Sequence, residues 1–334
     1  EPVTWGALPP TRQPAHAVAI APDGVTFALA QGNRIEIRTL AEKTVTLQQT
    51  LEAHKGSVQS LGWSPDGKLL VSGGFRQAII WNMGTGKPEQ VLEDNLAGRI
   101  TACAFINNGQ RLILADSLPT RLGRLHAYRT LGWSRIKTLR AHTDTIFALA
   151  SSPDGKLLAS TSADKLARLW DTSTLQPAGI LEGHTGYVLA AAFSPNNQRI
   201  ATTSTDHSVK IWDISSHNEE ITFSGRQSNH DITGILWTLD PAKEKPEEKD
   251  DWIVTVSADG IPRLFTELVN HEGKQTSAGA KERAWTGIDG QGLHSLAWSK
   301  EHKRILATDD AGNLHFRDVN GKPWKPKAPD PEET

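Results

Sequence analysis

Residue types that could form a hydrolytic triad recur along this 334-residue chain. An imidazole, a hydroxyl and a carboxylate can together activate a nucleophile for acyl transfer. Two consecutive stretches supply them in the same order: His142, Ser160 and Asp164, then His184, Thr202 and Asp206. A set that recurs from stretch to stretch belongs to the architecture of a protein. We therefore expect structural roles for both sets, no catalytic residues and no enzymatic activity.

Other kinds of chemistry find little support in the composition. The single cysteine, Cys103, excludes an internal disulfide and a cysteine-rich metal centre. Segment 240–251 is rich in acids but lacks the spacing of a calcium loop. Six histidines lie at no spacing typical of metal ligands: His207, His217, His271, His294, His302 and His315. We expect neither a metal nor a cofactor.

Charge and hydropathy exclude two further classes of partner. The 36 Lys and Arg residues nearly balance 38 Asp and Glu, for a net charge of −2. Nucleic-acid binding depends on neutralising phosphates, so this balance argues against it. No apolar run approaches the length of a membrane-spanning helix, so we expect no direct membrane span.

An internal repeat predicts the elements that position these residues. Ser-Pro-Asp-Gly occurs at 64–67 and 152–155, and related turns recur along the chain at spacings of 43, 42, 46, 42, 46 and 59 residues. The positions that match its proline are Pro22, Pro65, Asn107, Pro153, Pro195, Pro241 and Lys300. Apolar and polar residues alternate with period two inside each unit, which predicts short strands.

These units resemble the WD40 repeat family, whose signature is a Gly-His, a turn and a closing Trp-Asp about 40 residues on. The clearest unit is "HTGYVLAAAFSPNNQRIATTSTDHSVKIWD", from His184 to Asp213, and the likeness covers roughly residues 11–320. It implies an all-β, seven-bladed β-propeller with four strands in each blade. We expect one propeller domain over 1–320 and a Pro-rich tail or linker over 321–334.

The resemblance also implies a role for the recurring polar sets. In the family, a His, a Ser or Thr, an Asp and a Trp form a hydrogen-bonded tetrad within a blade. Here the tetrads are His142, Ser160, Asp164 and Trp170 in blade 4, and His184, Thr202, Asp206 and Trp212 in blade 5. The other blades depart from the pattern, because blade 2 lacks the turn Asp, blade 6 has Phe265 for Trp, and blades 1, 3 and 7 lack the His. Blades 4 and 5 should therefore be the most rigid.

Ring closure makes a further prediction. An open propeller would leave an unpaired strand edge. We expect residues 3–8 to pair with blade 7 as its fourth strand, with Trp5 packed on that edge, and we place Trp133 and Trp285 on outer strands.

Loops on a rigid scaffold carry function more often than the scaffold does. The blade 3 segment "ADSLPTRLGRLHAYRT" reads as a lengthened loop, and its basic residues suggest either a solvated surface or a docking patch for an acidic partner. Candidate partner-binding residues are Arg121, Arg124 and Arg129 in this segment, with Tyr187, Thr145 and Thr205 on the rim.

Three functional hypotheses follow. The first is a non-enzymatic scaffold for protein–protein interaction in a multi-protein assembly, with partner subunits that the sequence does not name. The second is an accessory propeller of a redox complex, because blades 2 to 5 resemble exported bacterial WD40 propellers that accompany c-type cytochromes; the motifs are "GGFRQAIIWNMGTGKP", "LGRLHAYR" and "SPDGKLLASTSADKLARLWD". It implies a periplasmic or otherwise extracytoplasmic location, with the cytoplasm as the alternative. The third is a propeller enzyme.

Overall fold

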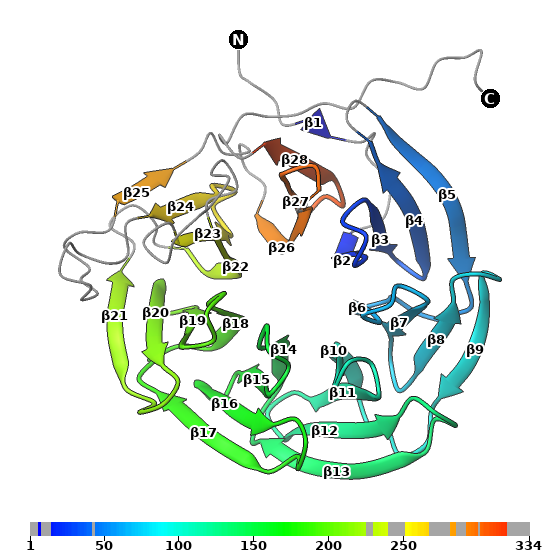
Figure 1. Cartoon of the computed structure of the whole chain (residues 1–334), viewed down its shortest axis with the longest axis horizontal. Coiled ribbons are helices and arrows are strands. Elements are labelled where there is room, and N and C mark those ends of the chain that lie inside the picture. Colours follow the sequence, from blue (N-terminus) through cyan, green and yellow to red (C-terminus); the bar gives the residue numbers. More distant parts are fainter. Residues whose placement is uncertain are drawn as a thin grey trace.

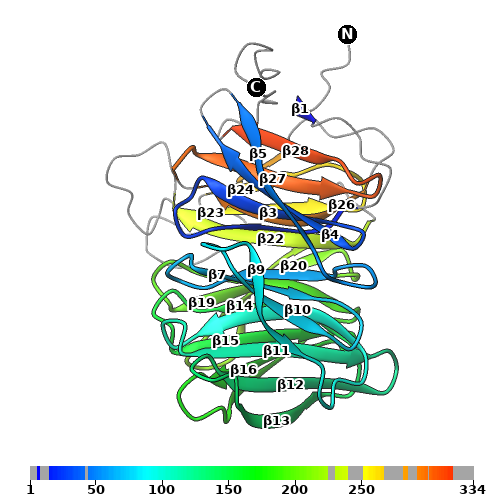
Figure 2. The same ribbon diagram turned by 90° about the vertical axis from the view of Figure 1, so that its right-hand side faces the viewer.

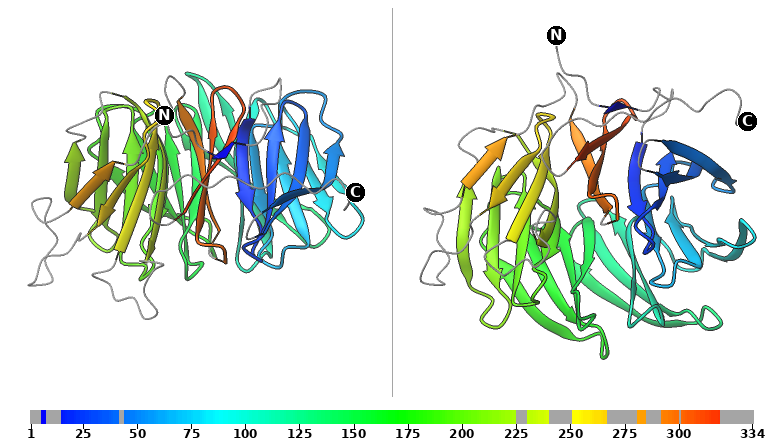
Figure 3. Two further views of the ribbon diagram at one scale, coloured as in Figure 1. Left: turned by 90° about the horizontal axis from the view of Figure 1, so that it is seen from above. Right: turned by 45° about the horizontal axis from the view of Figure 1, so that its top comes forward.

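The alternating segments form short antiparallel strands that group into seven four-stranded blades, and the blades are arranged in a ring (Figure 1). The structure is a computed structural model, and it describes residues 6–7, 15–41, 44–224, 230–239, 251–266, 281–284, 292–299 and 301–318. Seen from the side and from above, the blades form a flattened ring (Figures 2 and 3). The prediction of an all-β, seven-bladed propeller is confirmed.

The blades follow one another in chain order, each running from an inner to an outer strand. Blade 1 contains β2 (Ala15–Ile20), β3 (Thr26–Gln31), β4 (Arg34–Leu40) and β5 (Val45–Glu52). Blade 2 contains β6 (Ser60–Trp63), β7 (Leu69–Gly73), β8 (Ala78–Asn82) and β9 (Lys87–Leu92). Blade 3 contains β10 (Arg99–Ile106), β11 (Arg111–Leu118), β12 (Leu122–Arg129) and β13 (Arg135–His142). Blade 4 contains β14 (Ile146–Ser151), β15 (Leu157–Ser162), β16 (Leu166–Asp171) and β17 (Pro177–Glu182).

The remaining blades repeat this arrangement. Blade 5 contains β18 (Val188–Phe193), β19 (Arg199–Ser204), β20 (Ser208–Asp213) and β21 (Glu219–Ser224). Blade 6 contains β22 (Ile232–Leu239), β23 (Asp251–Ser257), β24 (Arg263–Thr266) and β25 (Lys281–Ala284). Blade 7 contains β26 (Leu293–Ser299), β27 (Arg304–Asp309) and β28 (Leu314–Asp318), and its outermost strand is β1 (Gly6–Ala7).

Strand β1 closes the ring. It pairs antiparallel with β28, with Gly6 opposite Phe316 and Ala7 opposite His315. The last blade is thus completed by the start of the chain, which confirms the predicted closure and removes the open edge that a linear array would leave. Trp5, which was expected to pack on this edge, lies outside the described residues, as do Trp285 and the tail 321–334.

The hydrophobic core lies between blades. Each buried apolar cluster combines side chains of two adjacent blades; Trp81, for example, packs with blade 1 residues such as Ile35 and Leu51, and Trp170 packs with Ile113 of blade 3. Blades 7 and 1 share such a cluster too, in which the rings of Phe27 and Phe316 lie 6.3 Å apart, edge to face. A blade alone would expose both of its faces, so the apolar burial that stabilises the fold requires neighbouring blades.

The Ser-Pro-Asp-Gly turns have a local physical cause. In blade 2, Ser64 Oγ donates to Asp66 Oδ1 at 2.6 Å and accepts from Leu69 N at 2.9 Å, which ties the two ends of the turn together. Gly67 takes a φ of 70°, a left-handed conformation that glycine adopts at little cost. These turns lie on one face of the ring, which we call the bottom face. The opposite, top face carries the turns between second and third strands and the connections between blades.

Blade 3 differs from expectation. Its basic segment is not a lengthened loop: β11 and β12 are eight-residue strands joined by a short turn at 119–121. The alternation continues through the segment, so its extra residues extend the ladder from Arg111 opposite Arg129 to Leu118 opposite Leu122. Trp133 was expected on an outer strand and instead lies in the turn that precedes β13, with a φ of 52°.

Candidate functional site

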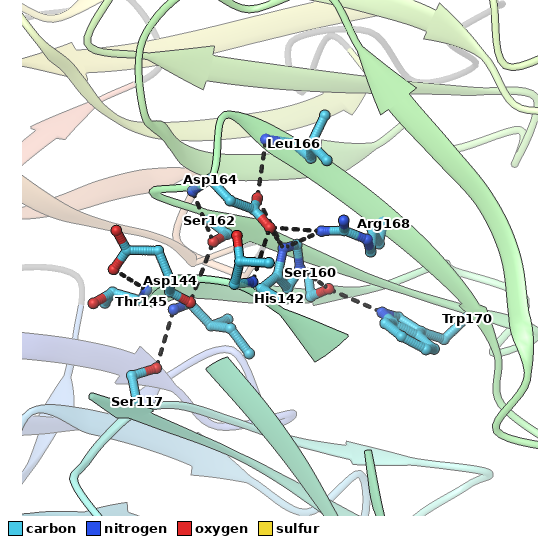
Figure 4. A network of polar contacts seen from close by, with 12 residues as sticks. Ser117, His142, Asp144, Thr145, Ser160, Ser162, Asp164, Leu166, Arg168 and Trp170 are labelled. Atoms are coloured by element: carbon cyan, nitrogen blue, oxygen red, sulfur yellow. Dashed lines mark hydrogen bonds and ion pairs between the residues drawn. The ribbon is translucent and has the colours of Figure 1, made fainter. Parts of the chain in front are cut away.

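Blade 4 contains a complete hydrogen-bonded tetrad below the top face (Figure 4). His142 lies at the end of β13, Ser160 on β15 and Trp170 on β16, while Asp164 occupies the turn between β15 and β16. His142 Nε2 lies 2.8 Å from Ser160 Oγ, and its Nδ1 lies 3.0 Å from Asp164. Trp170 Nε1 donates to the same hydroxyl at 2.9 Å. The sequence-predicted residues therefore meet in one network that spans the blade.

The tetrad carboxylate is held ionised. Burial acts to raise the pKa of Asp164, but hydrogen bonds and charge from His142 and Arg168 outweigh it and hold that pKa well below its usual range. Arg168 Nη1 lies 2.8 Å from Asp164 Oδ2. The carboxylate also accepts the main-chain N–H of Thr143 at 3.2 Å, so the tetrad fixes the connection that enters blade 4 from blade 3.

Blade 5 repeats the arrangement. His184 lies 2.8 Å from both Thr202 Oγ1 and Asp206 Oδ2, and Trp212 Nε1 donates to Thr202 Oγ1 at 2.8 Å. Asp206 accepts the main-chain N–H of Thr185 at 2.9 Å. Here too the carboxylate fixes the loop that leads into the blade.

Blade 2 keeps three members of the tetrad and replaces the fourth. His54 Nε2 lies 2.6 Å from Ser72 Oγ, which also accepts from Trp81 Nε1 at 2.8 Å. In place of the Asp, the amide of Gln77 hydrogen-bonds His54. Burial lowers the pKa of His54 to about 4, and the Gln77 hydrogen bond offsets only part of this. An amide cannot supply the charge that the Asp gives in blades 4 and 5.

The geometry of the tetrads does not allow hydrolysis at their hydroxyls. Ser160 is fully buried, and its oxygen already contacts both the His142 imidazole and the Trp170 indole. No substrate atom can reach it without unpacking the interface between blades 3 and 4. Within the described ranges, no three His, Cys, Asp or Glu side chains come together as a metal site would require.

Blades 3 and 7 contain buried His–Asp pairs that the sequence did not reveal. In blade 3, Asp116 contacts His126 Nε2 at 3.2 Å and Arg124 Nη2, and it accepts the main-chain N–H groups of Ala97 and Gly98. In blade 7, His315 Nε2 lies 2.7 Å from Asp309. Both histidines lie on the third strand of their blade, whereas the tetrad histidine lies before the first strand. The spacing between the tetrad histidine and the Ser-Pro-Asp-Gly turn therefore does not reveal them.

Blade 6 departs further from the tetrad than expected. Thr255 and Phe265 are buried as the pattern predicts. Asp259, however, pairs with Arg263, whose Nη2 lies 2.6 Å from its Oδ2, and His230 is exposed. An Asp–Arg ion pair thus replaces the Asp–His contact in this blade.

A cavity opens on the top face above blades 3 to 5. It has a volume of about 500 Å³, and Tyr187, Phe147 and Thr145 lie in its wall with Arg99 and Asp144. The rings of Phe147 and Tyr187 lie 6.2 Å apart, and 49% of Tyr187 is exposed. Sequence reasoning named Thr145 and Tyr187 as rim residues but did not name Phe147 or Asp144.

The tetrads hold this wall in place. Tyr187 N donates to Thr205 Oγ1 at 2.8 Å, and the Tyr187 carbonyl accepts from Thr205 N at 3.0 Å. Thr205 immediately precedes the tetrad carboxylate Asp206, which in turn fixes Thr185. The third rim residue, Thr205, therefore supports the Tyr187 main chain and does not line the cavity. Because the loop is already ordered, an exposed aromatic side chain on it loses little conformational entropy when a partner binds.

β-Bulges aim further side chains at the channel below this cavity. The first strands of six blades each have a register shift that ejects one residue. The ejected residues are His16, Thr101, Phe147, Leu189, Thr233 and His294, and all six line a channel cavity of about 320 Å³. Bulges commonly re-aim side chains at functional positions. Phe147 lines both cavities, so the top-face cavity lies next to the channel cavity.

The three arginines named as candidate partner-binding residues do not lie together. Arg121 is exposed at the top-face turn between β11 and β12. Arg124 is largely buried in its ion pair with Asp116, and its guanidinium also donates to the Asn95 carbonyl. Arg129 lies at the bottom end of β12. Because the segment forms a hairpin that spans the blade, these arginines do not make one continuous patch, and a role for any of them in partner binding stays a prediction.

Comparison with known proteins agrees with this architecture. The family model described as "WD domain, G-beta repeat" matches residues 45–82, 133–171 and 175–213. Each match begins at the outer strand of one blade and ends at the third strand of the next, so one sequence repeat joins two blades.

Curated relatives are WD repeat proteins. The chain is 30% identical over 140 residues to the WD repeat-containing protein WDS homolog of Arabidopsis thaliana, covering 41% of this chain and 26% of that protein. It is 33% identical over 130 residues to the U3 small nucleolar RNA-associated protein 12 of Saccharomyces cerevisiae, covering 39% and 13%. It is 35% identical over 98 residues to an uncharacterized WD repeat-containing protein of Synechocystis, covering 29% and 27%. The matched segments span about a quarter or less of each relative. The chain therefore contains WD40 repeats and folds as a seven-bladed WD40 β-propeller.

Proposed function

We propose that this protein is a non-enzymatic scaffold that binds another protein on its top face, at the cavity lined by Tyr187, Phe147 and Thr145. The observation that carries the proposal is the aromatic pair of Tyr187, half-exposed on a loop that the blade 5 tetrad fixes, and Phe147, partly exposed at the bulge in β14. Aromatic side chains supply most of the energy at many protein interfaces, especially where they are pre-ordered. WD repeat relatives support an interaction role in general terms.

A protein fits this surface better than a nucleic acid does. The whole chain has a net charge of −2, and the cavity wall combines one cation, Arg99, with one carboxylate, Asp144. A nucleic-acid site would need a continuous row of cations to neutralise phosphates. One relative is named as RNA-associated, which is equally consistent with a scaffold that acts through protein subunits of an RNA-containing assembly.

The test starts from a partner purified with the tagged chain from its source and measures affinity with purified components. Tyr187→Ser should weaken binding by at least about tenfold, because an aromatic anchor near the centre of an interface contributes more than about 1.4 kcal/mol. The matched control is Leu131→Ser, which removes a side chain that is 91% exposed in a bottom-face turn. Equal affinities for the two variants would contradict the proposed site.

An exported, cytochrome-associated setting is a finer proposal that rests on the sequence resemblance. The part of the chain that the structure describes holds no helix with the length and apolar character that crossing a membrane requires. Fractionation of source cells tests this setting: recovery with the periplasmic contents would support it, and recovery with the cytoplasm would contradict it.

A further inference from the structure

Blade 2 presents an exposed aromatic side chain where other blades carry the tetrad Asp. The turn between β7 and β8 contains Phe75 and Arg76, and 65% of Phe75 is exposed to solvent. In blade 4 the same turn carries Asp164, which points inward to His142. Because Gln77 takes over the contact with His54, the tip of the turn is free to point outward.

The main chain holds this exposed ring in a defined place. Phe75 forms a β-bridge with Arg99, the first residue of β10. The next residue, Arg76, donates from N to the Gly98 carbonyl at 2.7 Å and from Nε to the Leu96 carbonyl at 3.1 Å. These bonds fix Arg76 at a φ of 55°, a conformation that non-glycine residues rarely adopt. The turn is thus ordered by its neighbours, and the exposure of Phe75 is built into the fold.

Three exposed cations surround Phe75 without a carboxylate partner. Lys55, Arg76 and Arg99 are all exposed, and none of them forms an ion pair among the described residues. The nearby carboxylates are engaged elsewhere: Glu93 accepts from the Gln77 amide, and Asp144 accepts the main-chain N–H groups of Thr120 and Thr145. Both carboxylates keep their negative charge, so three cations face two carboxylates on this part of the surface, and all three cations are open to a ligand.

The surface is continuous with the proposed docking cavity. A cavity of about 480 Å³ is lined by Lys55, Phe75 and Arg76, and the cavity that Tyr187 lines begins at Arg99. The Phe75–Arg99 bridge joins the two. A strip on the top face thus runs from Phe75 past Arg99 to Tyr187, with an aromatic anchor at each end, Arg99 between them, and Lys55 and Arg76 beside Phe75.

We propose that this strip binds an extended acidic segment of the partner protein, with an apolar or aromatic side chain seated on Phe75 and carboxylates facing Lys55, Arg76 and Arg99. The inference rests on the proposed function and names the chemistry of the partner. An acidic peptide fits better than RNA, because a peptide can place separate carboxylates against the three cations and uncharged residues beside Glu93 and Asp144, whereas the unbroken row of phosphates in RNA would run past both carboxylates.

The test uses defined peptides and the full chain. The probe is a fluorescein-labelled peptide of sequence Gly-Glu-Asp-Phe-Glu-Asp-Leu-Gly, whose binding is measured by fluorescence anisotropy. One control peptide replaces the acids by Gln and Asn, and another replaces Phe and Leu by Ser. We expect the probe to bind more tightly than either control, and its affinity to fall when salt is raised to about 0.5 M.

Variants locate the binding. Phe75→Ser and the double variant Lys55→Glu with Arg99→Glu should each weaken probe binding about tenfold. Leu131→Ser and Arg129→Glu are the matched controls, because both remove exposed side chains from the bottom face, and they should leave affinity unchanged. Unchanged melting temperatures show that the variants fold.

Three results would overturn the inference: no saturable binding of the probe, equal binding of the Gln/Asn control peptide, or tighter binding of a uridine oligonucleotide that displaces the probe. Affinity for the purified partner separates the two levels of the argument. If Tyr187→Ser lowers the affinity for the partner and Phe75→Ser leaves that affinity unchanged, the acidic-segment inference fails while the proposed function stands. If neither variant lowers the affinity, both fail.

Discussion

Acidification should destabilise this propeller through His54, the tetrad histidine that has no carboxylate beside it. Burial lowers its pKa from 6.5 to about 4, against the smaller opposing effect of the Gln77 hydrogen bond. Because the folded-state pKa lies below the unfolded one, the unfolded chain takes up the proton first. The stabilisation is therefore complete above about pH 6.5 and is lost as the pH falls toward about 4.

The magnitude follows from the two pKa values. One pKa unit corresponds to about 1.4 kcal/mol, so the neutral imidazole contributes about 3 kcal/mol to the free energy of unfolding near pH 7. Lowering the pH from about 7 to about 5 should remove about 2 kcal/mol of this through His54 alone. The pKa of His142 is also lowered, chiefly by burial, so other histidines add to the loss in the wild-type chain.

Comparison with a variant isolates the contribution of His54. Urea unfolding followed by tryptophan fluorescence gives the free energy of unfolding at both pH values for the wild type, His54→Gln and the control His302→Gln, which alters a partly exposed residue in the turn after β26. We expect the wild type and the control to lose about 2 kcal/mol more than His54→Gln. Equal losses in all three chains would refute the reasoning.

Three further outcomes are expected. Asp206→Asn should lower the free energy of unfolding by about 1–3 kcal/mol in urea titrations, because Asp206 contacts His184 and accepts the main-chain N–H of Thr185. The same variant should weaken partner binding although Tyr187 is intact. A loss of stability with full affinity would contradict the link between the tetrad and the cavity. Deleting residues 1–9 should lower the melting temperature, because it removes strand β1, which pairs with β28. Deleting residues 321–334 is the control. Closure by β1 would be contradicted if the first deletion lowered the melting temperature no more than the control does. Gly98→Ala should lower the melting temperature, because the added Cβ would lie 2.0 Å from the Ser117 carbonyl oxygen. Gly56→Ala is the control, because its Cβ meets nothing within 4 Å and the melting temperature should not change. Equal melting temperatures of the two variants would contradict a close contact at Gly98.

Much of the fold could be predicted from the sequence because each repeat carries the same physical solution. The Ser-Pro-Asp-Gly turns need their side-chain hydrogen bonds and a left-handed Gly67, so their residue types recur at blade spacing. The third-strand position that Trp170 occupies also recurs in each repeat, although its residue type varies. The strand registers place Tyr128, Phe265 and Arg317 at this position in blades 3, 6 and 7.

What escaped prediction depends on contacts between segments that no spacing encodes. The Asp116–His126 pair of blade 3 forms within a hairpin, so neither residue lies at the position where a tetrad member was sought. Arg124 looked free in the sequence, but the buried Asp116 requires a cation and takes its guanidinium. Phe147 reaches the channel only because a bulge interrupts β14.

Hydrogen–deuterium exchange with and without the purified partner tests the central claim most directly. If the top face is the docking surface, the partner should protect main-chain amides in the loops that carry Thr145 and Tyr187 and in the turns at 74–77 and 119–121. The bottom-face turns at 130–134 and 194–198 should exchange as they do in the free chain. Protection of those bottom-face turns, with exchange on the top face unchanged, would contradict the account.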